Sequence, residues 1–65
     1  MLDLQHQQLA EQFQDLLTQE QQVEGSYAAM AARASDPEIR TQLESIRTDK
    51  QRHIELIQRL LEIVA

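Results

Sequence analysis

Three polar residues, Glu20, Lys50 and His53, stand at positions where a regular apolar stripe would place core side chains. A carboxylate, an amine and an imidazole in one place can form ion pairs, transfer protons or bind a metal ion. In the sequence, Asp36 lies almost midway between Glu20 on one side and the pair of Lys50 and His53 on the other. If the chain reverses at Asp36, the equal rise per residue of two helices brings all three residues to one height. We therefore expect a single polar layer, and the chemistry of this chain should occur there.

Two amphipathic helices must position that layer, because apolar residues recur at alternating steps of three and four on both sides of Pro37. Asp36 is the expected N-cap of the second helix and Pro37 its first residue, while Ser35 and Glu38 have the spacing of a capping box. We predict an all-α fold, a single two-helix antiparallel hairpin over residues 1–65, with helices at about 2–34 and 37–64 and a turn at 35–37. The two stripes comprise Leu2, His6, Leu9, Phe13, Leu16, Glu20, Val23, Tyr27, Met30 and Ala34, and then Ile39, Leu43, Ile46, Lys50, His53, Ile57, Leu60 and Val64.

A hairpin of this length offers each helix only one partner, so much of its apolar surface would stay in water. The second stripe is also wide, with Leu56 and Ile63 on one flank and Ile54 and Leu61 on the other. That width favours contact with more than one neighbour. We therefore expect a homo-oligomer, and the simplest closed form is a twofold dimer that makes a four-helix bundle around two copies of the polar layer.

Composition narrows the function classes. The chain has no cysteine, so any metal would have carboxylate or imidazole ligands. Its net charge of −5 and its lack of a Lys/Arg run argue against nucleic acid or an anionic membrane as a partner. The longest apolar run, at 27–32, is too short for a membrane span, and no signal peptide is expected. The expected location is the cytoplasm.

Three segments, Glu20 to Tyr27, Ser35 to Ile39 and Asp49 to His53, together resemble the half-ferritin hairpin of rubrerythrin-like and encapsulated ferritin-like proteins. The resemblance covers residues 16–64. It implies a hairpin that dimerises into a ferritin-like bundle, often within a larger ring. It further implies a di-iron site at the dimer interface that oxidises iron(II), and an encapsulin shell as a partner, with the protein inside a nanocompartment.

The ligands implied by the resemblance are a glutamate on the first helix and a Glu-x-x-His pair on the second. Glu20 and His53 match the first glutamate and the histidine, but Lys50 stands in place of the second glutamate. A protonated lysine about 4 Å from a divalent ion costs roughly 8 kcal/mol at an effective dielectric constant of about 20. The presence of Lys50 therefore argues against iron binding, and we expect Lys50 to act as a counter-ion for Glu20.

Three functions follow from these observations. The first is a ferritin-like scaffold or interaction module without catalytic residues or cofactor, in which Glu20, Lys50, His53 and Tyr27 form a buried polar layer. The second is an iron-storage or ferroxidase half-ferritin that binds iron through Glu20 and His53, with Asp49 or Glu24 as substitute ligands. The third is an unrelated helical dimerisation hairpin.

Gly25, in the middle of the first helix, marks either a close backbone approach or a tolerated glycine.

Overall fold

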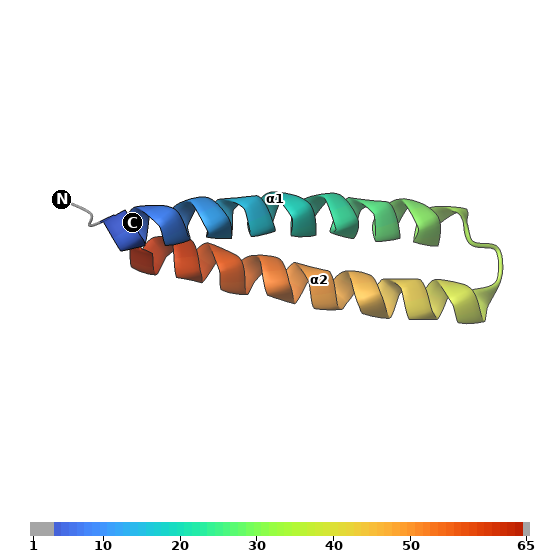
Figure 1. Cartoon of the computed structure of the whole chain (residues 1–65). Coiled ribbons are helices and arrows are strands. Elements are labelled where there is room, and N and C mark those ends of the chain that lie inside the picture. Colours follow the sequence, from blue (N-terminus) through green and yellow to red (C-terminus); the bar gives the residue numbers. More distant parts are fainter. Residues whose placement is uncertain (1–3, 65) are drawn as a thin grey trace.

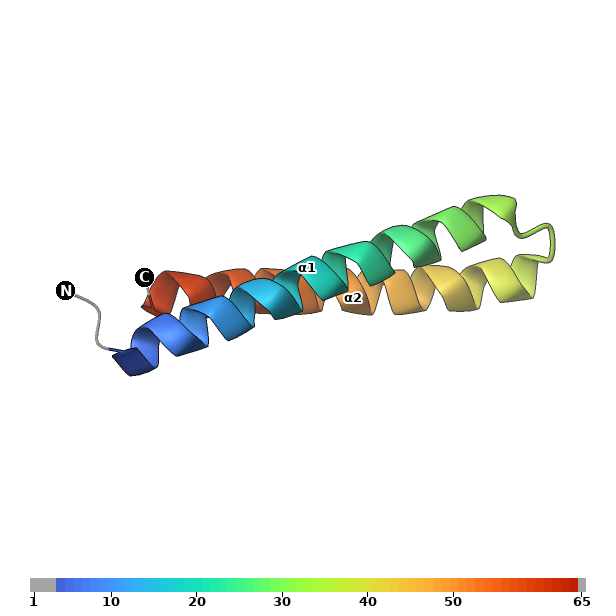
Figure 2. The ribbon, with the colours of Figure 1, turned by 45° about the horizontal axis from the view of Figure 1, so that its top comes forward.

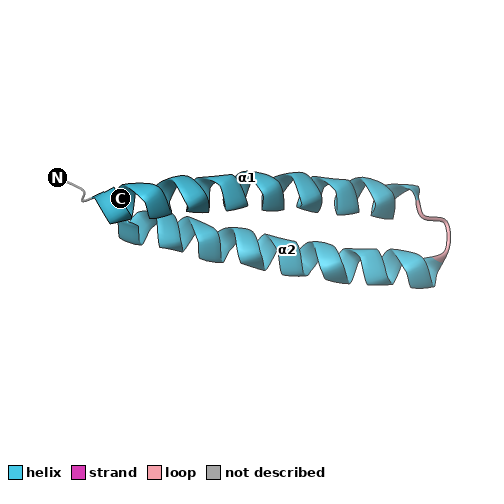
Figure 3. Ribbon diagram, viewed as in Figure 1, coloured by secondary structure: helices cyan, strands magenta, loops and turns pink. Residues whose placement is uncertain are grey.

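The computed structural model describes residues 4–64, which form an antiparallel hairpin of two long helices (Figure 1). Helix α1 spans Leu4–Arg33 and helix α2 spans Pro37–Val64, and a single short loop joins them (Figure 3). The predicted all-α hairpin is confirmed, whereas its dimerisation stays a prediction. The molecule is a rod with extents of 52 × 14 × 11 Å, so each of the described residues lies near the surface.

The turn between the helices is fixed by backbone hydrogen bonds and one side-chain cap. At the end of α1, the Ala34 amide donates to the carbonyls of Met30 and Ala31 over 3.0 and 3.3 Å. Asp36 caps α2 because its Oδ1 accepts from the amides of Glu38 (2.8 Å) and Ile39 (3.2 Å). The predicted N-cap is therefore confirmed. The predicted capping box from Ser35 is wrong, since Asp36 already occupies the N-cap position and satisfies those amides.

The residues that face each other between α1 and α2 form a contact seam with steps of three and four. Compared with the predicted stripes, the face of each helix that contacts the other helix is rotated about the helix axis. Leu16, Val23 and Met30 are exposed, while the residues that follow them face α2. A helix with one neighbour can bury only one face, and the predicted stripes ran along the centre of a broader apolar surface. The seam comprises Ala10, Phe13, Leu17, Glu20, Glu24, Tyr27 and Ala31 of α1, and Leu43, Arg47, Lys50, Ile54, Ile57, Leu61 and Val64 of α2.

The apolar core of the hairpin is small. Among residues 4–64, only Leu17, Ala31 and Val64 are buried, and no polar side chain is. The two helices cross near their middles in the view of Figure 2. Half-buried or buried side chains of the seam recur along both helices, but they enclose no broad core. Neither helix in the described part of the chain is long and apolar enough to cross a membrane.

Candidate functional site

The expected polar layer forms at the middle of the hairpin, with Glu20 of α1 at its centre. Lys50 Nζ donates to Glu20 Oε1 over 3.3 Å, and His53 Nδ1 lies 3.2 Å from Glu20 Oε2. Lys50 and His53 are three residues apart on α2, so they leave the helix on neighbouring turns and reach one carboxylate together. Both oxygens of Glu20 therefore have a partner from the opposite helix.

The layer is sheltered on one side and open on the other. The side chains of Glu20 and Lys50 are 21% and 26% exposed, because both belong to the contact seam. The His53 side chain is 55% exposed, because it lies one position before the seam residue Ile54. The contact between His53 Nδ1 and Glu20 Oε2 is a hydrogen bond in the tautomer that carries a proton on Nδ1. The Glu20 and Lys50 charges offset each other inside the hairpin.

A second polar contact crosses the seam one turn closer to the loop. Arg47 Nε donates to Glu24 Oε1 over 2.9 Å, and the Gln51 side-chain amide donates to the same oxygen over 3.3 Å. The hydrogen bond from Arg47 to Glu24 is the main cause that raises the pKa of Arg47 above its ordinary value. The sequence interpretation missed this pair because both residues lie one position outside the predicted stripes. Their nearly equal separations from Asp36 along the chain could have revealed it.

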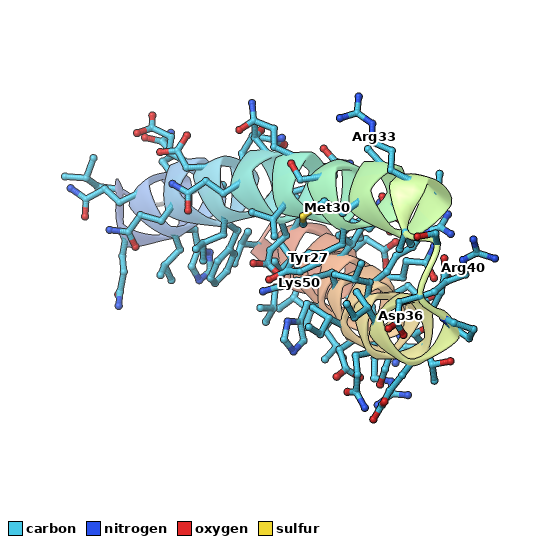
Figure 4. The ribbon with its side chains drawn as sticks, turned by 90° about the vertical axis from the view of Figure 1, so that its right-hand side faces the viewer. Tyr27, Met30, Arg33, Asp36, Arg40 and Lys50 are labelled. Carbon is cyan, nitrogen blue, oxygen red and sulfur yellow. The ribbon has the colours of Figure 1, made fainter. Side chains whose placement is uncertain are left out.

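The other predicted site residues do not join the layer around Glu20. Glu24 faces Arg47 and Gln51, and Asp49 is exposed on α2 without a hydrogen bond to Glu20 in the described part of the structure. Tyr27 is half-buried on the seam, two turns beyond Glu20. In the end-on view of Figure 4, Tyr27 and Lys50 lie between the two helices, while Arg33 points away from α2.

The donor atoms that one chain brings together are too few for a metal site of the implied kind. Within residues 4–64, no three His, Asp or Glu side chains form a cluster that could hold a metal ion. Lys50 Nζ also lies 3.3 Å from the carboxylate that would bind the metal. Its positive charge therefore competes with a cation for Glu20. The described residues enclose no pocket either, so the layer is part of a helix–helix seam and not the floor of a cavity.

A comparison with protein families matches residues 5–65 to a domain of unknown function, DUF892. The chain belongs to the DUF892 family. Comparisons with curated proteins and with solved structures gave no match. The DUF892 match covers both helices and therefore includes Glu20, Lys50 and His53 within the family's domain. The DUF892 description names no activity, so the ferritin-like relationship and the iron chemistry that it implies stay predictions.

Proposed function

We propose that this DUF892 chain is a ferritin-like scaffold or interaction module in which an ion-paired polar layer takes the place of an iron site. Glu20, Lys50 and His53 stabilise the middle of the hairpin and carry out no catalytic step. The proposal corresponds to the first of the three functions that the sequence suggests. It requires the protein to keep its structure without a metal ion.

The observation that supports this proposal is the complete engagement of the Glu20 carboxylate. Lys50 binds one oxygen at 3.3 Å and His53 binds the other at 3.2 Å, so a metal ion would have to displace one of them. A lysine in contact with the carboxylate supplies the positive charge that a cation would otherwise provide. Since Glu20 and Lys50 are both about three-quarters covered, removing only one of them leaves the other charge poorly compensated.

Two further features support the ferritin-like part of the proposal. Glu20 and His53 meet from different helices at the height where the resemblance implies two iron ligands. The third residue at that height is Lys50, which stands at the position of the second glutamate ligand. A single substitution, Lys50→Glu, would therefore restore the ligand pattern of the resemblance.

Anaerobic calorimetric titration with iron(II) tests the proposal. The natural protein should bind no iron at its polar layer, because Lys50 neutralises Glu20. The Lys50→Glu variant should bind about one iron per chain, because it offers two glutamates and a histidine from each hairpin. Arg52→Glu is the matched control, since it makes the same change of charge on the same helix at an exposed position. It should bind no more iron than the natural protein.

The alternatives give different titrations. Binding of about one iron per natural chain would overturn the proposal and favour an iron-handling protein that works despite Lys50. If neither the natural protein nor Lys50→Glu binds iron, the layer has no relation to an iron site. In that case the ferritin-like part of the proposal is wrong, and the third function, an unrelated dimerisation hairpin, is favoured.

A further inference from the structure

The contact seam carries charge of only one sign on each helix. Its charged residues on α1 are Glu20 and Glu24, and those on α2 are Arg47 and Lys50. Within the described chain, the α1 seam therefore presents carboxylates without a cation, and the α2 seam presents cations without a carboxylate. The charges occupy neighbouring turns at the middle of the hairpin. Apolar or aromatic seam residues flank them on both sides, namely Ala10, Phe13, Leu17, Tyr27 and Ala31 of α1, and Leu43, Ile54, Ile57, Leu61 and Val64 of α2.

The overall composition of α2 does not explain this separation of signs. The helix has equal numbers of acidic and basic residues, yet every acidic residue lies at an exposed position away from the seam. The absence of acidic residues is therefore a property of the seam itself. The acidic residues of α2 are Glu38, Glu44, Asp49, Glu55 and Glu62, and the basic ones are Arg40, Arg47, Lys50, Arg52 and Arg59.

Each charged seam residue meets one of opposite sign from the other helix. Lys50 Nζ lies 3.3 Å from Glu20 Oε1, and Arg47 Nε lies 2.9 Å from Glu24 Oε1. The carboxylate side chains of Glu20 and Glu24 are only 21% and 20% exposed, so water screens them incompletely. Arg47 also contacts Glu44 on its own helix, but that contact is longer, at 3.5 Å. A like charge opposite either carboxylate would replace an attraction by a repulsion.

The loop already fixes how the two helices of one chain line up. Helix α1 ends at Arg33, α2 begins at Pro37, and Asp36 caps α2, so neither helix can slide by a turn without breaking the cap. The ion pairs are therefore not required for the register within a chain. The loop does not determine which helix each seam would pair with when other copies are near. Apolar contacts do not determine it either, because they are not directional and both seams are rich in them.

Pairing of either helix with a copy of itself would bring together charges of one sign. Two α1 seams combine the carboxylates of Glu20 and Glu24 from both copies, and no cation of either seam lies among them. Two α2 seams combine Arg47 and Lys50 from both copies in the same way. This holds in any register and in either orientation. Opposed like charges exclude wrong partners in other helix pairs and protein interfaces.

From these observations we infer that the seam carries a helix-pairing code, in which the carboxylates of α1 select α2 and the cations of α2 select α1. Neither helix then pairs along its seam with a copy of itself. Glu24 and Arg47 thereby gain a role that equals that of Glu20 and Lys50. The inference goes beyond the proposed function, because it concerns which helices recognise each other and holds whether or not the polar layer replaces an iron site.

Reversal of one sign at a time tests the code in the full chain. Glu20→Lys with Glu24→Lys makes the charged part of the seam wholly basic, and Arg47→Glu with Lys50→Glu makes it wholly acidic. Each variant should melt about 10 °C or more below the natural protein, because like charges then face each other. An equimolar mixture of the two variants should melt above either one alone, since each α1 then finds an α2 of opposite sign in the other chain. Circular dichroism measures all of these temperatures.

A fourfold exchange restores opposite signs within one chain. Glu20→Lys, Glu24→Lys, Arg47→Glu and Lys50→Glu together keep the net charge of −5. This variant should regain most of the melting temperature that the reversed chains lose. The small remaining loss is expected because His53 no longer meets a carboxylate at position 20.

Matched controls make the same changes of charge outside the seam. Glu11→Lys with Asp15→Lys on α1, and Arg52→Glu with Arg59→Glu on α2, change the net charge equally at exposed positions. Both variants should melt close to the natural protein, and mixing them should not raise the melting temperature. The controls thus separate general attraction between a basic and an acidic chain from pairing along the seam.

Three outcomes overturn the inference. If the reversed chains melt like the natural protein, the seam charges select nothing. If the fourfold exchange melts as low as the reversed chains, the four residues act through their individual shapes and not through their signs. If the mixture melts as its separate components do, the code does not operate between chains. A chelator in every solution excludes metal, so iron binding by the natural protein would overturn the proposed function and leave this inference standing.

Discussion

Lys50 determines how the charge of Glu20 is compensated within the hairpin. The carboxylate is mostly covered, and water alone solvates it incompletely. His53 contacts the other oxygen, but its side chain is more than half exposed and it carries a charge only when protonated. Lys50 is thus the one permanent cation in contact with Glu20 among the residues that the structure describes. The stability of the protein should depend on the pair and not on either residue alone.

Lys50→Met should lower the free energy of unfolding by about 1 to 3 kcal/mol, because it leaves a partly buried carboxylate without its cation. The double variant Glu20→Gln with Lys50→Met should recover most of that loss, since it removes both charges and keeps similar side-chain volumes. Thermal unfolding followed by circular dichroism measures both effects. A loss of about 1 kcal/mol lowers the melting temperature by about 4 to 8 °C for a chain of this size.

Arg52→Met controls for the loss of a positive charge on α2, because Arg52 is exposed and has no contact with Glu20 in the described structure. Its melting temperature should stay close to that of the natural protein. An equal melting temperature for Lys50→Met and the natural protein would show that the 3.3 Å contact contributes nothing to stability. Lys50 would then have no role as a counter-ion.

For the helices, the sequence correctly predicted the features that depend on local signals, namely where each helix lies and where α2 begins. Asp36 and Pro37 marked the start of α2, and the spacing of apolar residues marked both helices. The same spacing could not say which part of a broad apolar surface faces the other helix. That choice depends on packing, since the small side chain of Ala31 is 2% exposed while its neighbour Met30 is left open. The Arg47–Glu24 pair was missed for the same reason.

The layer around Glu20 was predictable because it needs only the position of the turn and an equal rise per residue in both helices. If the contact face is predicted one residue away from its true position, the height of a side chain along the helix axis is still almost correct. The exposure of the side chain does change, which is why His53 reaches Glu20 from the edge of the seam and not from its centre.

Gly25 illustrates an alternative that the structure resolves. A Cβ atom built on Gly25 meets nothing within 4 Å, so no close backbone approach requires glycine at this position. Gly25→Ala should therefore raise the free energy of unfolding by about 0.5 to 1 kcal/mol, the usual difference between these residues inside a helix. Ala32→Gly, two turns later on the same side of α1, is the reverse control and should lower the free energy of unfolding by a similar amount. A destabilising Gly25→Ala would mean that another molecule approaches the backbone there.

The whole molecule is a thin rod with little interior. Its radius of gyration is 15.2 Å, against about 11 Å for a compact domain of this length. Because only three of the described side chains are buried, two helices alone provide few of the apolar contacts that offset chain entropy. If the exposed apolar side chains bind a second copy, as the predicted homo-oligomer requires, folding and association are coupled, and stability must then depend on protein concentration.

The melting temperature should therefore rise by about 5 °C for each tenfold increase in concentration, since a tenfold change in binding equilibrium corresponds to about 1.4 kcal/mol shared by two chains. Leu60→Lys places a charge among the exposed apolar side chains of α2 and should abolish this dependence while lowering the melting temperature at high concentration. Gln58→Lys adds the same group at an exposed polar position two residues away and should keep the dependence. If Leu60→Lys retains the full concentration dependence, the chains associate through another surface, because a buried, unpaired lysine at the interface could not be tolerated without loss of affinity.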